Sequence, residues 1–122
     1  HNIEIDLPNV PKIDFEKTKN ILINFYSNAI SACKNTEASK ITTSIYKNAN
    51  KLIFDVKDNG KGIKESNISK IFTPSYSTNK AEGHGYGLHN SSIIAKNLGG
   101  EIIASSKGED QGAQFRLELP WH

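Results

Sequence analysis

Two asparagines on a predicted helix have the type and spacing to bind a cation. In the stretch "NFYSNA", Asn24 and Asn28 are four residues apart, so on a helix both side chains lie on one face. Asparagine is a weak helix former, because its amide competes for backbone hydrogen bonds. An amide carbonyl oxygen suits Mg²⁺, a hard cation that takes oxygen ligands. Taken alone, the pair is explained more simply by a solvated polar face.

An acid followed by two glycines forms a second group, in the stretch "DNGKGI". Asp58 begins it, and Gly60 and Gly62 follow. Such residues are typical of turns, because glycine and asparagine tolerate a positive φ. A buried or half-buried carboxylate can also accept a hydrogen bond from an amine, and adenine offers its exocyclic amino group. Asn59 and Lys61 are interpreted as ordinary turn residues.

Three glycines before a predicted helix form a third group. Gly83, Gly85 and Gly87 lie in the stretch "GHGYGLHNSS". Glycines at a helix entrance let backbone N–H groups approach a phosphate closely, and the helix dipole favours the anion. The spacing fits neither the dinucleotide-binding fingerprint nor the P-loop. A flexible loop before a helix is therefore the alternative interpretation.

The histidines and serines of this stretch give weaker signals. His84 and His89 are five residues apart across a helix entrance, which is a poor arrangement for a metal pair. We interpret them as solvated side chains. Ser91 and Ser92 have no acid–base partner in the sequence, so we exclude nucleophilic catalysis by them.

Predicted strands and helices must position these residues. Alternation of apolar and polar residues predicts strands, and apolar residues at helical spacing predict helices. Strands are expected over residues 2–7, 40–47, 51–58, 101–106 and 113–120, helices over 14–34 and 88–98, and a short helical turn over 65–72. Asp14 is a suitable N-cap for the first helix.

The order of these elements is strand, helix, hairpin, helix, hairpin. Two hairpins require antiparallel pairing, which argues against a doubly wound parallel sheet. We therefore expect an α+β fold of two layers, a mixed and mostly antiparallel sheet with the helices on one face.

Size and composition indicate one globular domain over residues 1–122, with 36% hydrophobic and 23% charged residues. A net charge of +2 predicts no nucleic-acid binding, and no apolar run is long enough to span a membrane. The single cysteine, Cys33, excludes an internal disulfide, fits a reducing, cytoplasmic location, and is interpreted as a buried inert thiol. Because the sequence begins with His1 and not with an initiator methionine, we expect it to be a C-terminal piece of a longer protein.

Four motifs together resemble the catalytic domains of sensor histidine kinases. The stretches "NFYSNAISA", "DNGKGI", "IFTPSYST" and "GHGYGLH" are similar, in order, to the N box, first glycine box, F box and second glycine box of that family. The closing "LGGEIIASS" and "GAQFRLELP" are similar too, so the resemblance covers about the whole chain. The wider GHKL superfamily also includes gyrase, MutL and heat-shock chaperone ATPases.

The resemblance implies the Bergerat ATP-binding fold and a site for ATP and Mg²⁺. Asn28 would coordinate magnesium, with Asn24 one turn away on the nucleotide side. Asp58 would accept a hydrogen bond from the adenine amino group, and Gly60 and Gly62 would let the chain pass close to the base. Further nucleotide-binding residues implied by the family motifs are Ile63, Phe72, Gly83, Gly85, Tyr86, Gly87 and Leu88.

Position 24 bears on the reaction. Superfamily members that hydrolyse ATP usually carry glutamate there as a base, whereas Asn24 cannot take a proton. The resemblance thus implies transfer of the γ-phosphoryl group to a histidine, with Asn24 and Asn28 as the catalytic residues. Residues 73–84 would form the lid over ATP.

The implied partners are the phosphoacceptor dimerisation domain of the same kinase and, indirectly, a response regulator. No nucleic acid and no direct membrane contact are expected, and the isolated domain should be a monomer that does not phosphorylate itself. Two alternatives stay open: an ATPase or conformational clamp of the GHKL type, and a nucleotide-binding module without kinase activity. Ser31, where many members have Lys or Arg, leaves the second one open.

Overall fold

The computed structural model describes residues 2–6, 14–72 and 87–120, and the alternating and helical patterns of the sequence form the expected elements there. Its elements are β1 (Asn2–Asp6), α1 (Phe15–Ala32), β2 (Ile41–Asn48), β3 (Lys51–Asp58), a 3₁₀ helix η1 (Glu65–Lys70), α2 (Gly87–Asn97), β4 (Glu101–Ser105) and β5 (Ala113–Pro120). The N-cap of α1 is Asp14, whose Oδ1 accepts a hydrogen bond from the Lys17 N–H at 3.0 Å.

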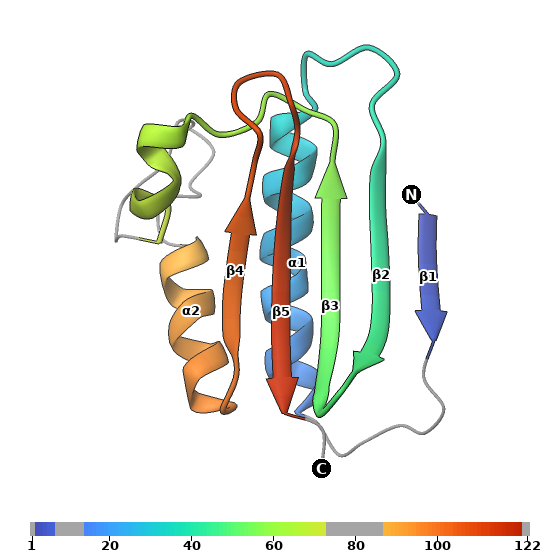
Figure 1. The fold of residues 1–122 in the computed structure, drawn as a ribbon, viewed down its shortest axis with the longest axis vertical. Helices are drawn as coiled ribbons and strands as arrows, with labels where there is room; N and C mark the ends of the chain where they lie inside the picture. Colours follow the sequence, from blue (N-terminus) through green and yellow to red (C-terminus); the bar gives the residue numbers. More distant parts are fainter. Residues whose placement is uncertain (1, 7–13, 73–86, 121–122) are drawn as a thin grey trace.

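The five strands form one sheet in the order β1-β2-β3-β5-β4 (Figure 1). β1 pairs with β2 in parallel, and the β2–β3, β3–β5 and β5–β4 pairs are antiparallel. The predicted fold class is confirmed: the sheet is mixed and mostly antiparallel, and helices pack on one of its faces.

The core lies between α1 and the middle of the sheet. Ile21, Phe25 and Ala29 recur at helical spacing on α1 and have no exposed surface. Phe25 stacks on Phe115 of β5 with 5.6 Å between ring centroids. Each large buried side chain of this kind contributes roughly 1.5–3 kcal/mol. In Figure 1, α1 accordingly lies behind the central strands, while α2 lies beside β4.

The opposite face of the sheet carries a hydrogen-bonded polar cluster centred on Asp55. Its carboxylate accepts hydrogen bonds from Tyr46 Oη, Gln114 Nε2 and the Arg116 guanidinium, at 2.9–3.2 Å. These partners stabilise the carboxylate, although Asp55 is only 8% exposed. Burial and the nearby Asp55 raise the pKa of Tyr46, so its phenol remains a donor.

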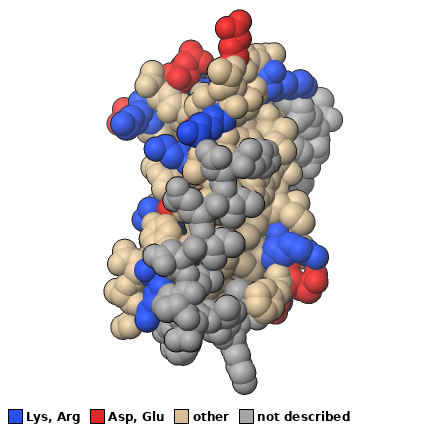
Figure 2. All heavy atoms as spheres, turned by 90° about the vertical axis from the view of Figure 1, so that its right-hand side faces the viewer, with Lys and Arg blue, Asp and Glu red and all other residues tan. Residues whose placement is uncertain are grey.

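Charged side chains of both signs occur on the side of the molecule that faces the β1 edge (Figure 2). On the described part of this side, lysine or arginine and acidic residues are interspersed among other residues, without a continuous band of one sign. This distribution agrees with the net charge of +2.

Candidate functional site

Asp58 is the last residue of β3, and its side chain turns into the helical layer. It is 4% exposed, and its Oδ1 accepts a hydrogen bond from the Gly60 N–H at 2.8 Å. Burial raises the pKa of the Asp58 carboxyl, and hydrogen bonds from the backbone of Gly60 and Ala113 lower the pKa by less. A carboxylate so placed favours any ligand that brings a hydrogen-bond donor.

The second oxygen of Asp58 has no partner within the protein. Oδ2 of Asp58 and Oγ1 of Thr18 are the buried side-chain oxygens, among the described residues, that make no hydrogen bond. A buried acceptor left without a donor costs roughly 1–3 kcal/mol. An N–H group from a bound molecule would remove this cost, so Asp58 fits an amine such as that of adenine.

The two glycines after Asp58 are required by packing. A Cβ on Gly60 would lie 2.4 Å from the carbonyl oxygen of Ala32, at the end of α1. Gly62 has a φ of +69°, and a Cβ there would lie 2.1 Å from the carbonyl oxygen of Gly108. These contacts give both glycines a reason in the protein itself. The predicted clearance beside a base stays a prediction.

Asn59 is not an ordinary turn residue, and that interpretation was wrong. Its Oδ1 accepts a hydrogen bond from the Lys40 N–H at 2.7 Å, and its Nδ2 donates to the Ala38 carbonyl at 3.1 Å. The amide therefore ties the turn after β3 to the loop between α1 and β2. The Cys33 thiol, buried as predicted, lies 3.8 Å from the same Oδ1.

The far end of the turn is held by Ser106, which sequence reasoning missed. The Ile63 N–H donates to Ser106 Oγ at 3.0 Å, and this hydroxyl donates to the Gly112 carbonyl at 2.6 Å. One serine thus joins the glycine turn to the loop between β4 and β5. Serine is common in loops, so its type alone carries no signal of this role.

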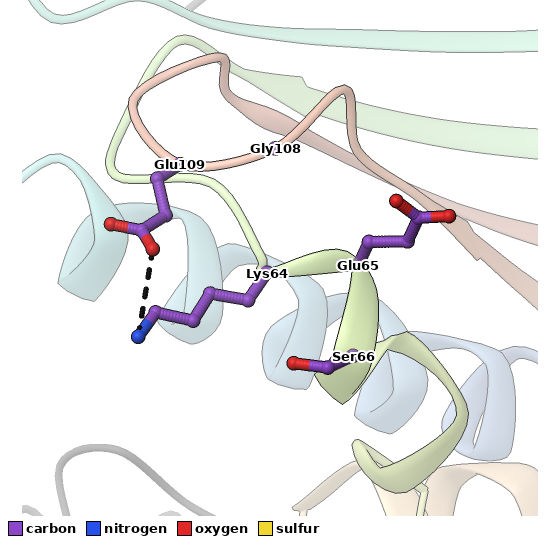
Figure 3. Close-up of a pocket in the computed structure, with 5 residues that line it drawn as sticks. All are labelled: Lys64, Glu65, Ser66, Gly108 and Glu109. Carbon is purple, nitrogen blue, oxygen red and sulfur yellow. Dashed lines mark ion pairs between the residues drawn. The ribbon is translucent and has the colours of Figure 1, made fainter.

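A shallow hollow lies beside this turn, where the side chains of Lys64 and Glu109 point toward one another and form an ion pair at 3.5 Å (Figure 3). Glu65 points away from that pair. The hollow is lined by Lys64, Glu65, Ser66, Gly108 and Glu109. No residue that the sequence predicted for the site lines it, so its location carries no argument about the chemistry of Asp58.

Asn24 joins α1 to the start of α2, where the sequence predicts that phosphate binds. Its Nδ2 donates to Ser91 Oγ at 2.7 Å and lies 3.3 Å from the Gly87 carbonyl oxygen. Gly87 is the first residue of α2, and Ser91 is fully buried on that helix. Asn28 lies one turn further along α1 and is half-buried.

Phe72 and His89 lie on the two sides of residues 73–86. His89 Nδ1 lies 3.2 Å from the Phe72 carbonyl oxygen, so the ring in the tautomer protonated at Nδ1 donates there. Phe72 and Leu88 both pack against the core. The interpretation of His89 as a solvated side chain was wrong, because it is half-buried and bonded.

Three predicted site residues, Gly83, Gly85 and Tyr86, and the predicted lid lie outside the described residues. Most of the described ones come from three places: the end of β3 with the turn that follows it, the asparagine pair on α1, and the start of α2. The Lys61 N–H joins the first two by donating to the Ala32 carbonyl at 2.9 Å, and Asn24 joins the last two. The site residues therefore follow α1 from its C-terminal end, next to the turn after Asp58, to its middle, where Asn24 meets the start of α2.

Residues 2–6, 14–72 and 87–120 contain neither a cluster of metal ligands nor a membrane-spanning helix. They contain no group of three or more His, Cys, Asp or Glu side chains that could hold a metal ion. The helices among them are too short or too polar to cross a membrane.

Comparison with known proteins identifies the family of this fold and site. Residues 13–122 match the family described as histidine kinase-, DNA gyrase B-, and HSP90-like ATPases. The chain belongs to this family. Its class is therefore the ATP-binding domain with the Bergerat fold, as the sequence motifs predicted.

Two of the similar proteins are described as sensors, one of them as a sensor histidine kinase. The chain is 38% identical over 114 residues to the sensor histidine kinase ZraS of Escherichia coli O157:H7, covering 93% of the chain and 24% of that protein. It is 33% identical over 122 residues to the aerobic respiration control sensor protein ArcB of Escherichia coli (strain K12), covering 94% of the chain and 15% of that protein. The chain thus spans about a quarter or less of the length of these relatives.

Two solved structures resemble the fold. The catalytic domain of the histidine kinase ThkA superposes with a TM-score of 0.81 at 31% identity, covering 97% of this chain and 76% of that one. Full-length ShkA in complex with AMPPNP gives 0.79 at 28% identity, covering 98% and 25%. This likeness places the domain with histidine kinase catalytic domains.

Proposed function

We propose that the chain binds Mg-ATP and transfers the γ-phosphoryl group to a histidine on a separate dimerisation domain. The observation that carries the proposal is Asp58 Oδ2, a buried acceptor without a donor beside the glycine turn. The exocyclic amino group of adenine supplies an N–H at such an oxygen. The relatives' description as sensor histidine kinases supports the same reaction.

Asn28 of α1 would suit as a protein ligand for a magnesium ion. Mg²⁺ keeps several waters and takes few protein oxygens, so one amide oxygen from Asn28 is a sufficient protein ligand. Magnesium held there would supply positive charge that offsets the charge of the phosphates. Asn28 is half-buried on the face of α1 that also carries Asn24. The N-terminus of α2 offers its backbone N–H groups to phosphate oxygens at Gly87 and Leu88.

Position 24 favours phosphoryl transfer over hydrolysis. A hydrolase needs a base to activate water, and the Asn24 amide cannot accept a proton. Its Nδ2 is engaged by Ser91 and Gly87. Catalysis by Asn24 and Asn28 would then consist of positioning and charge stabilisation. In this proposal the acceptor domain is the direct partner, and a response regulator is the indirect partner. The reaction takes place in the cytoplasm, where ATP is available.

A transfer assay with a supplied acceptor tests this function. The chain is mixed with γ-labelled ATP, Mg²⁺ and a separately expressed dimerisation domain from a related kinase. Label that appears on the acceptor and is lost in acid but kept in base marks a phosphohistidine, which we expect. Release of free phosphate without a labelled acceptor would instead identify an ATPase. ATP binding without either product would identify a nucleotide-binding module. The same acceptor with its histidine replaced by alanine is the control.

A further inference from the structure

The contact between Asn24 and Ser91 assigns a role to a serine that neither the motifs nor the proposed reaction uses. Ser91 lies on the second turn of α2 and has no exposed surface. A buried hydroxyl needs a hydrogen-bond partner. Its partner comes from 67 residues away, since Asn24 Nδ2 donates to Ser91 Oγ at 2.7 Å.

The orientation of the Asn24 amide follows from the second group that it meets. The Gly87 carbonyl oxygen, 3.3 Å from Nδ2, can only accept a hydrogen bond. The NH₂ end of Asn24 must therefore face the Gly87 carbonyl, whichever role the Ser91 hydroxyl takes. The other end of the amide, Oδ1, makes no hydrogen bond with any described residue; it also lies near the start of α2, 3.3 Å from where a Cβ on Gly87 would stand.

We propose that Ser91 is a positioning residue, which together with the Gly87 carbonyl fixes the Asn24 amide so that Oδ1 is the end offered to the nucleotide. Oδ1 is an acceptor, so it receives a donor or a cation. A water bound to Mg²⁺ fits it, and an unprotonated phosphate oxygen does not. The proposal rests on the proposed function, since it names the chemistry that Asn24 presents in that site.

Neighbouring Ser92 offers a matched control. Its hydroxyl donates to the His89 carbonyl at 2.7 Å, within the same helix, and does not contact Asn24. Replacing either serine by alanine removes one hydroxyl from the same stretch of α2. Only Ser91→Ala removes one of the two acceptors of the Asn24 amide.

The first measurement uses the protein without nucleotide. In NMR spectra of ¹⁵N-labelled protein, the side-chain NH₂ of Asn24 is assigned from its loss in Asn24→Ala. Ser91→Ala should shift this NH₂ signal and speed its exchange with water, whereas Ser92→Ala should leave both unchanged. An NH₂ signal that is the same in Ser91→Ala and in the parent would overturn the proposal.

The second measurement is ATP affinity by calorimetry, with Mg²⁺ and with EDTA. Loss of one hydrogen bond predicts about a three- to tenfold weaker affinity of Ser91→Ala with Mg²⁺, and little change with EDTA. In the Asn24→Ala background, Ser91→Ala should add nothing. An added loss there, or an equal loss with and without Mg²⁺, would show that Ser91 does not act through Asn24.

The two measurements separate the two proposals. If the parent binds no ATP while Ser91→Ala still releases the Asn24 NH₂, the proposed function fails and so does the role for Oδ1, but the contact itself stands. If the parent binds ATP and Ser91→Ala matches it in both measurements, the proposed function stands and the positioning role fails.

Discussion

Gly60 packs so closely on Ala32 that the turn after β3 and the end of α1 form one unit. A Cβ on Gly60 would lie 2.4 Å from the Ala32 carbonyl oxygen, and the Lys61 N–H donates to that same oxygen at 2.9 Å. The contact places Asp58, two residues before Gly60, against the helix that carries the asparagine pair. The shape of the candidate site therefore depends on Gly60, which this packing requires even when no ligand is bound.

Gly60→Ala should destabilise the protein in the absence of nucleotide. The methyl group meets a backbone carbonyl that cannot move away without disturbing α1, so we expect a loss of about 1–3 kcal/mol in the free energy of unfolding. Urea unfolding followed by circular dichroism measures it. Asn90→Ala, at an exposed position of α2, is the control. Equal midpoints for Gly60→Ala and the parent would mean that the glycine is not needed for packing.

Asn59→Ala should also lower stability, by about 2 kcal/mol, because it removes the hydrogen bonds to the Lys40 N–H and the Ala38 carbonyl. Asn59→Asp keeps the acceptor for Lys40 but turns a carboxylate oxygen toward the Ala38 carbonyl oxygen, so it should also be less stable than the parent. Unfolding in urea compares the two variants with the parent. If both variants were as stable as the parent, the hydrogen bonds of Asn59 to Lys40 and Ala38 would not contribute to stability.

The titration of Asp58 should make stability depend on pH. Burial raises the pKa of this carboxyl above its ordinary value of 3.8, so the folded protein holds a proton that the unfolded chain has released. The free energy of unfolding should therefore fall as the pH rises from 3.8 through the native pKa. Asp58→Asn cannot titrate, so the stability of the parent relative to this variant should decrease across that window. A relative stability that is constant with pH would contradict the assignment.

The Cys33 thiol should react slowly in the folded protein. It is 8% exposed, and burial first, then the charge of Asp58, raises its pKa above that of a free cysteine. Both effects lower the fraction of reactive thiolate. A thiol reagent that absorbs on reaction should modify the parent slowly at neutral pH and rapidly in concentrated urea. Equal rates under the two conditions would place Cys33 at the surface.

The fold could be predicted because its signals are local. Alternation along "KLIFDVKD" and "AQFRLELP" predicts β3 and β5, and each pairs with its predicted hairpin partner, β3 with β2 and β5 with β4. β3 also pairs with β5, from which η1, α2 and β4 separate it in the sequence. The parallel pairing of β1 with β2 has no local signal, since it joins strands separated by α1.

The site was only partly predictable because its supporting contacts are tertiary. Nothing in "DNGKGI" indicates that Asn59 reaches back to Lys40 or that Gly60 meets Ala32. Ser91 did carry a signal, since it lies three residues after Leu88 and four before Ala95, on the apolar side of α2. A polar residue on such a stripe predicts a buried partner.

The most direct test of the account is the choice between two nucleotides by the parent and by Asp58→Ala. ITP has a carbonyl oxygen where ATP has the exocyclic amino group, so it cannot donate to Asp58 Oδ2. Calorimetry of the parent with Mg²⁺ should show ATP binding about 10- to 100-fold more tightly than ITP, as a hydrogen bond to a charged group predicts. Asp58→Ala should remove this preference, with circular dichroism showing that it remains folded. Equal affinities of the parent for ATP and ITP, or an unchanged preference in Asp58→Ala, would contradict the assignment of Asp58 as the residue that binds adenine.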